Sequence, residues 1–164
     1  MSKNTFPSYG FIKDVKHQAT IVCDCLGHGK NNTAVDMLLE TACAETGMGR
    51  ILDRTLKAGL GLCQVDNGKP YHPFDDIKKR SAKYRSKIKR DLGIDLDLIE
   101  WNDLRYNTFL ALLFCRLHYL PVSDDIPLTL KGRAAYWKRH YNTNAGKGDV
   151  DHFLKMVYAY RDLE

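Results

Sequence analysis

Hydrophobic and polar positions follow the period of an α-helix along most of the chain, and runs rich in β-branched residues are scarce. This pattern predicts a mainly α-helical protein with at most a small β element. A length of 164 residues fits a single domain that spans the whole chain. Helices are expected at residues 11–26, 34–46, 73–92, 101–120, 133–141 and 150–163.

Glycine, proline and capping residues mark the ends of these helices. Gly47 and Gly49 are suited to end the second helix, and Pro121 to end the fourth. Side chains within residues 31–33 can cap the start of the second helix, and Asp149 can cap the last one. The glycine-rich segment 47–73 favours turns, with room only for short strands, for example around residues 61–65.

Composition narrows the class of protein. With 44% hydrophobic and 27% charged residues, the chain resembles a folded domain rather than a disordered or fibrous protein. No stretch approaches the roughly 20 consecutive apolar residues of a membrane helix, so no membrane span is expected. The N-terminus lacks the apolar run of a secretory signal, which predicts synthesis in a cytoplasm without a signal peptide.

The cysteines and histidines predict neither a metal site nor a cofactor. The cysteine count is odd, and the Cys23-Asp24-Cys25 pair is too closely spaced for an ordinary disulfide. The six histidines lack the spacing of a helical metal site. We therefore expect free cysteines that pack as small hydrophobic residues. They are Cys23, Cys25, Cys43, Cys63 and Cys115.

The net charge of +5 is concentrated in one segment. Residues 78–90 contain eight basic and no acidic residues, so the rest of the chain has a charge of 5 − 8 = −3. The segment is either a solvated helix face or a surface attracted to an anionic cell envelope. The segment does not favour nucleic acid as a partner, because Tyr84 is the only aromatic residue there that can stack on a base.

Glu45 is the strongest candidate for acid chemistry. On the predicted second helix it lies about 20° from Leu38, whereas Glu40 is on the opposite face. Partial burial and the negative end of the helix dipole would both raise its pKa. Such a glutamate can protonate a glycosidic oxygen near neutral pH. A salt-bridged structural glutamate is the alternative.

Four short blocks along the chain add to this interpretation. The first is Glu45-Thr46-Gly47, and the second is Gly61-Leu62-Cys63-Gln64. The third combines residues 107–111 with Leu117-His118-Tyr119-Leu120, and the fourth covers residues 134–143, which contain Tyr136-Trp137-Lys138 and Tyr141-Asn142-Thr143. In this order they resemble motifs of lytic transglycosylases and goose-type lysozymes, especially the small peptidoglycan hydrolases of bacteriophages and prophages. The resemblance covers roughly residues 33–153.

The resemblance implies a lysozyme-like domain that binds peptidoglycan glycan strands. It gives Glu45 the position of the single catalytic acid. Gly61 and Gln64 match the residues that shape the floor of the cleft. Candidates for sugar contact, or for holding Glu45, are Tyr119 and Tyr141, and Asn142 matches a residue that faces the cell wall. The chain departs from the pattern at Cys63, where methionine or phenylalanine is usual, and after Thr143, where Ala-Gly follows two residues late.

The resemblance also implies a mechanism with one carboxylate. Glu45 protonates the bond between N-acetylmuramic acid and N-acetylglucosamine, and the 6-hydroxyl of the sugar closes the ring as a 1,6-anhydro product. Asp53 and Asp66 are candidates for a second carboxylate, although both suit loop or capping roles better. Attack by water would make the protein a hydrolytic lysozyme instead.

A phage enzyme of this kind is made in the cytoplasm of a bacterial host and acts in the cell wall during genome entry or lysis. It can travel in the virion, where other virion proteins would be its partners. Two further alternatives stay open: a virion structural protein that keeps a lysozyme-like fold without turnover, and a basic nucleic-acid-binding helical protein.

Overall fold

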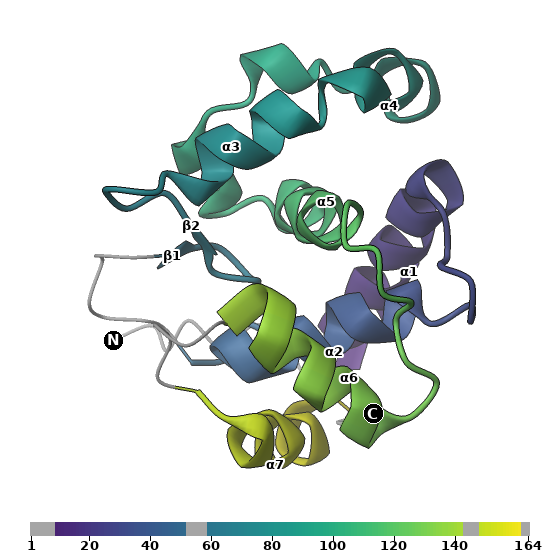
Figure 1. The fold of residues 1–164 in the computed structure, drawn as a ribbon, viewed down its shortest axis with the longest axis vertical. Coiled ribbons are helices and arrows are strands. Elements are labelled where there is room, and N and C mark those ends of the chain that lie inside the picture. The colour runs from purple at the N-terminus through teal and green to yellow at the C-terminus, as the bar shows by residue number, and fades with distance from the viewer. Residues whose placement is uncertain (1–8, 52–58, 143–147, 162–164) are drawn as a thin grey trace.

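The computed structural model describes residues 9–51, 59–142 and 148–161. Within these ranges the chain is mainly α-helical with one small antiparallel sheet, which confirms the predicted fold class (Figure 1). The helices are α1 (Tyr9–Leu26), α2 (Ala34–Thr46), α3 (Pro73–Arg80), α4 (Arg85–Leu92), α5 (Thr108–Tyr119), α6 (Leu130–Trp137) and α7 (Val150–Tyr160). Strands β1 (Gly59–Leu60) and β2 (Val65–Asp66) pair as a hairpin, with Gly59 opposite Asp66.

Helix α2 lies deep in the molecule, because α1, α5 and α7 all pack against it. Figure 1 shows α3 and α4 in the upper part, α6 and α7 in the lower part, and α5 and the hairpin between them. Since neighbours surround α2, both of its faces are buried, including the one that holds Glu40. The C-terminal end of α2 therefore meets both parts of the fold.

The predicted signals at the helix ends are confirmed at several positions. Gly47 follows α2 in the left-handed conformation, with φ 55°, and its N–H bonds to the Cys43 carbonyl oxygen. Left-handed geometry is accessible to glycine at little cost. The Asp149 side chain accepts from the His152 N–H at 2.7 Å and caps α7. At the start of α2, however, the Thr33 hydroxyl donates to Ile126 O instead of capping the helix.

The prediction of one helix over residues 73–92 was wrong. Helix α3 ends at Arg80, a 3₁₀ turn spans Ala82–Tyr84, and α4 begins at Arg85. The break lets α3 pack against α5 while α4 packs against α1, which one straight helix of this length would not do. Phe74, Ile77 and Ile88 are buried on the two segments. Their helical spacing continues across the break, so the periodicity alone did not reveal it.

The boundaries of two other helices also differ from the prediction. The segment 101–120 divides into a 3₁₀ turn, Trp101–Leu104, and α5, because the Asn107 side chain accepts from the Leu110 N–H at 3.0 Å and starts a new helix. Helix α6 begins at Leu130, where Thr129 caps it through the Gly132 N–H. It continues as a π-helical turn over Lys138–Asn142.

All five cysteines are free and buried, as expected. In the described part of the chain, no helix is both long and apolar enough to cross a membrane. The expectation about a signal peptide concerns mainly residues 1–8, which lie outside the described ranges.

Candidate active site

Glu45 lies in the last turn of α2 with a half-buried side chain. Its Oε1 accepts a hydrogen bond of 3.0 Å from Nε1 of Trp137, the last residue of α6. Burial raises the pKa of Glu45 from its ordinary value of 4.5 to about 7, and the bond from Trp137 acts in the opposite direction. A carboxyl group in this state is available as a proton donor at neutral pH.

The second block, residues 61–64, is the turn between β1 and β2. Gly61 has φ 77°, and a Cβ atom there would lie 2.1 Å from the Leu104 carbonyl oxygen, so a glycine is needed for this close approach. Gln64 also has a positive φ, 50°, and its Nε2 donates to Gly61 O at 3.0 Å. Of the strand predicted around residues 61–65, only Val65 belongs to a strand, and residues 61–64 form the turn between β1 and β2.

Thr46 joins this turn to the end of α2. Its Oγ1 donates to Leu62 O at 2.7 Å and accepts from the Gly49 N–H at 2.9 Å. Thr46 is 5% exposed, so both bonds are shielded from water. The residue after Glu45 thus fixes the first block against the second.

The fourth block contacts the second block, and the third block packs against the fourth. Tyr141 donates its hydroxyl proton to Cys63 O at 2.6 Å, and its ring lies 4.6 Å from that of His118, centroid to centroid. His118 Nε2 donates to the His140 carbonyl oxygen at 2.8 Å. Burial lowers the pKa of His118 from 6.5 to about 4, so this imidazole is neutral at neutral pH. The four blocks, far apart in the sequence, form one continuous set of contacts next to Glu45.

The structure corrects the expected role of Tyr119 in sugar contact. Its side chain is only 2% exposed, its ring stacks on Tyr141 at 5.2 Å, and its hydroxyl is 2.9 Å from Thr41 Oγ1. Burial raises the pKa of both tyrosines well above the ordinary range, and the charge of Glu45 adds to this effect. Tyr119 therefore supports the site from behind and is not itself accessible to a ligand.

Asn142 is held by its own helical turn. Lys138 Nζ donates to Asn142 Oδ1 at 2.8 Å and to Gly148 O at 2.6 Å. Asn142 remains half-buried, and the contacts that hold its oxygen do not involve Glu45. The following Thr143 lies outside the described residues.

Trp137 is the site residue that the sequence analysis missed. It belongs to the fourth block, but only the tyrosine and asparagine of that block were singled out. The available signal was chemical: a buried indole N–H requires an acceptor, and Glu45 is the acceptor here. Trp137 is 1% exposed, and its ring also packs on Phe153 of α7 at 5.3 Å.

Of the two aspartates considered as a second carboxylate, only Asp66 lies in the described part of the chain, and its hydrogen bond is not to Glu45. Asp66 Oδ1 accepts from the Gly68 N–H at 2.7 Å, the capping role expected for it. Asp53 lies outside the described residues.

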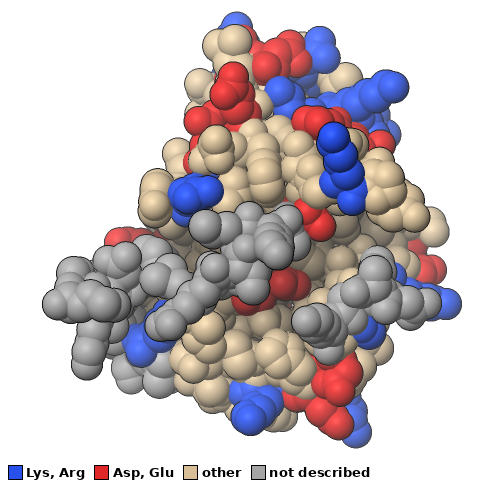
Figure 2. Space-filling model, turned by 90° about the vertical axis from the view of Figure 1, so that its left-hand side faces the viewer, with Lys and Arg blue, Asp and Glu red and all other residues tan. Residues whose placement is uncertain are grey.

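Figure 2 shows the face of the molecule at the hairpin side, where atoms of acidic residues are visible in a central hollow. No group of three possible metal ligands occurs among the described residues.

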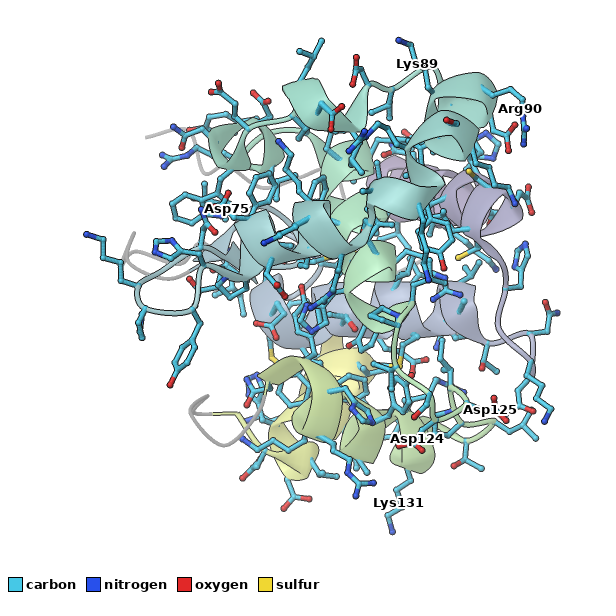
Figure 3. The ribbon with its side chains drawn as sticks, turned by 45° about the horizontal axis from the view of Figure 1, so that its top comes forward. Asp75, Lys89, Arg90, Asp124, Asp125 and Lys131 are labelled. Atoms are coloured by element: carbon cyan, nitrogen blue, oxygen red, sulfur yellow. The ribbon has the colours of Figure 1, made fainter. Side chains whose placement is uncertain are left out.

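The basic segment 78–90 lies around α3 and α4, and one of its residues, Arg80, contacts the third block, with Nη2 3.5 Å from the His118 carbonyl oxygen. Figure 3 shows Lys89 and Arg90 at one end of the molecule and Asp124, Asp125 and Lys131 at the other. Part of the positive charge is neutralised locally, since acidic neighbours pair with four basic residues. These pairs are Arg80–Asp76, Arg85–Asp97, Lys89–Asp95 and Arg90–Asp91.

Comparison of the chain with protein-family models, with curated proteins and with solved structures finds no match.

Proposed function

We propose that this protein cleaves the glycan strands of peptidoglycan as a lytic transglycosylase of the lysozyme-like class, with Glu45 as its catalytic acid. The observation that carries the proposal is the state of this carboxyl group. It is half-buried beside an apolar core, its pKa is raised to about 7, and Trp137 fixes its orientation. The meeting of all four blocks beside it supports the same conclusion.

In the proposed reaction, neutral Glu45 donates its proton to the glycosidic oxygen between N-acetylmuramic acid and N-acetylglucosamine. The bond to the leaving sugar breaks as positive charge develops at the anomeric carbon. The Glu45 carboxylate then takes the proton of the 6-hydroxyl, which attacks that carbon and closes the 1,6-anhydro ring. The enzyme returns to its protonated state, and no water is consumed.

The other block residues have supporting roles in this mechanism. Trp137 orients the carboxyl group and stabilises its charged form after proton transfer. The tight turn at Gly61 and Gln64 brings backbone and a half-buried amide to the hairpin side of the site. Tyr141 holds that turn through Cys63 O. We further propose that the protein is encoded by a phage and opens the cell wall during genome entry or lysis, which rests on the resemblance of the blocks.

The test is mass spectrometry of the products released from purified sacculi by the wild-type protein and by Glu45→Gln. Anhydro-muropeptides from the wild type and none from the variant are expected. Glu100→Gln is the matched control, since the same change is made at an exposed glutamate, and it should keep its activity. Reducing-end products lost in Glu45→Gln would make the protein a hydrolytic lysozyme. No products from a folded wild-type protein would contradict cleavage of peptidoglycan.

A further inference from the structure

Two polar contacts link α2 to α6, and only one of them involves the proposed catalytic acid. Glu45 accepts from Trp137, as described above. Five residues earlier on α2, Glu40 accepts two hydrogen bonds from Arg133: 2.6 Å from Nε to Oε1 and 3.0 Å from Nη2 to Oε2. Arg133 precedes Trp137 by four positions, so both side chains leave α6 on the same face, about 6 Å apart along its axis.

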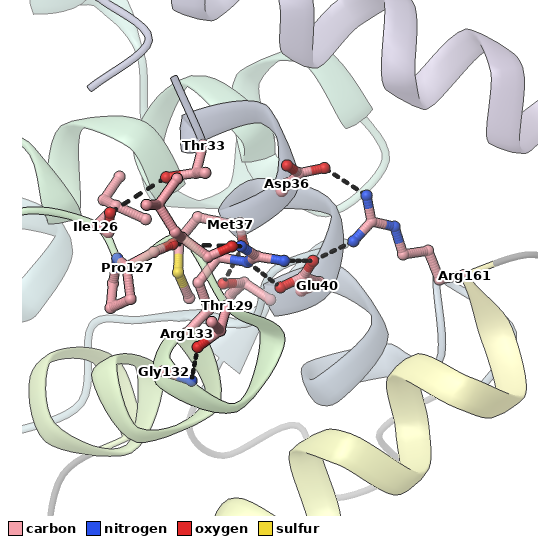
Figure 4. A network of polar contacts seen from close by, with 12 residues as sticks. Thr33, Asp36, Met37, Glu40, Ile126, Pro127, Thr129, Gly132, Arg133 and Arg161 are labelled. Carbon is pink, nitrogen blue, oxygen red and sulfur yellow. Dashed lines mark hydrogen bonds and ion pairs between the residues drawn. The ribbon is translucent and has the colours of Figure 1, made fainter. Parts of the chain in front are cut away.

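The Arg133 guanidinium connects more than the two helices. Its Nη1 donates to Leu128 O at 2.8 Å and to Pro127 O at 3.2 Å. Both acceptors belong to the loop that leads into α6 (Figure 4). Nε, Nη1 and Nη2 thus all have acceptors. A planar group held in this way fixes both the rotation of α6 about its axis and its position along α2.

Glu40 is also held from the opposite side. Arg161, just after α7, contacts both Glu40 and Asp36, so the carboxylate lies between two arginines (Figure 4). The Glu40 side chain has no exposed surface, and that of Arg133 is 8% exposed. Burying such a pair is costly, and well-packed apolar residues would often be at least as stabilising. What the pair provides beyond stability is a defined geometry.

We propose that Glu40 and Arg133 are positioning residues, which hold α6 so that the Trp137 indole meets the Glu45 carboxylate. The consequence for activity rests on the proposed function, but the geometric part does not. Arg161 contacts the same carboxylate from α7 and shares no helix with Trp137, so it provides a matched comparison. A network that served stability alone would respond to changes at either arginine in the same way.

The experiment compares wild type, Arg133→Lys and Arg161→Lys by NMR. The chain has two tryptophans, so the indole N–H spectrum contains two signals, and Trp101, which donates to Val65 O, is an internal reference. Four glutamates make the Glu45 carboxyl titration resolvable. In Arg133→Lys we expect the Trp137 signal to move and the pKa of Glu45 to rise by about 1, because a bond to its charged form is weakened. In Arg161→Lys both should stay as in the wild type.

Activity on sacculi is measured in parallel. Arg133→Lys should lower kcat/KM about ten-fold with the protein still folded, and Arg161→Lys should leave it near the wild-type value. Unchanged Trp137 and Glu45 signals in Arg133→Lys, or equal changes in both variants, would overturn the proposal. If Arg133→Lys does not fold, Glu40→Gln, which keeps the size of the side chain, tests the same contact. Inactive wild type with the expected NMR changes would refute the proposed function and leave the positioning role intact.

Discussion

Trp137 Nε1 donates a hydrogen bond of 3.0 Å to Glu45 Oε1, across 92 positions of sequence. This bond and the burial of the carboxyl group act on its pKa in opposite directions, and burial dominates. The result is a group that keeps its proton to about pH 7 and is also oriented when it loses it. Both properties are useful to a residue that first donates and then accepts a proton.

Replacing Trp137 with phenylalanine should raise the pKa of Glu45 further. The apolar ring maintains most of the burial, but the bond to the charged carboxylate is lost, and such bonds contribute about 1.5–3 kcal/mol. We expect a rise of at least about 1, seen as a shift to higher pH of the alkaline limb of the kcat/KM profile, and directly by NMR titration.

Trp101→Phe is the control for this change. The Trp101 indole donates to Val65 O at 2.8 Å and is not bonded to Glu45. The Trp101→Phe variant should therefore have the same alkaline limb of the kcat/KM profile as the wild type. A limb that moves equally in the two variants would show that the Trp137 bond has no specific effect on Glu45.

Glu45→Gln should make the protein more stable at high pH. Glu45 is protonated in both the folded and the unfolded chain below pH 4.5, but between 4.5 and about 7 only the folded chain keeps the proton. Stability of the wild type is therefore lost as pH rises through this window, by up to about 3 kcal/mol. Glutamine does not ionise and escapes this loss.

Thermal unfolding of both proteins from pH 4 to 9 measures the effect. The gain in Tm of Glu45→Gln should be near zero at pH 4.5, grow toward pH 7 and level off above it, at several degrees. A gain that does not depend on pH would mean that the Glu45 pKa is not raised in the folded state.

Gly61→Ala should be strongly destabilising. The new Cβ would meet the Leu104 carbonyl oxygen at 2.1 Å, and φ is 77°, so a clash with backbone adds to the cost of left-handed geometry. Together these predict a loss of about 3–5 kcal/mol. Gly93→Ala is the matched control, because φ is 69° there but nothing lies within 4 Å of the added atom. It should cost only about 1–2 kcal/mol in urea unfolding.

Thr46→Val should weaken the contact between the end of α2 and the hairpin turn. The substitution keeps the shape but leaves Leu62 O and the Gly49 N–H without their hydroxyl partner, at a cost of about 2–4 kcal/mol. Thr46→Ser keeps the hydroxyl and should lose about 1 kcal/mol, for one buried methyl group. Equal losses of unfolding free energy in the two variants would show that the hydroxyl is not important.

Sequence periodicity predicted the fold class and several helix ends, because these depend on local chemistry. The span of α2, residues 34–46, was predicted as observed, since a glycine follows it where left-handed geometry is required. The break between α3 and α4 was not predicted. Residues 77 and 88 would share one face of a continuous helix, and both are buried on the broken one as well, so only the packing of each segment on a different partner decides.

The candidate site shows the same division. The sequence alone determined that Glu45 ends an apolar stripe near the C-terminus of a helix, and that a glycine-rich turn follows it. Tertiary structure decided which residues surround it: Trp137 as its partner, Tyr119 as a buried support, and Glu40 in an ion network rather than in solvent. The physical reason is that helical position sets only the direction of a side chain. Its burial, its hydrogen bonds and its pKa depend on segments that are distant in sequence and meet only in the folded chain.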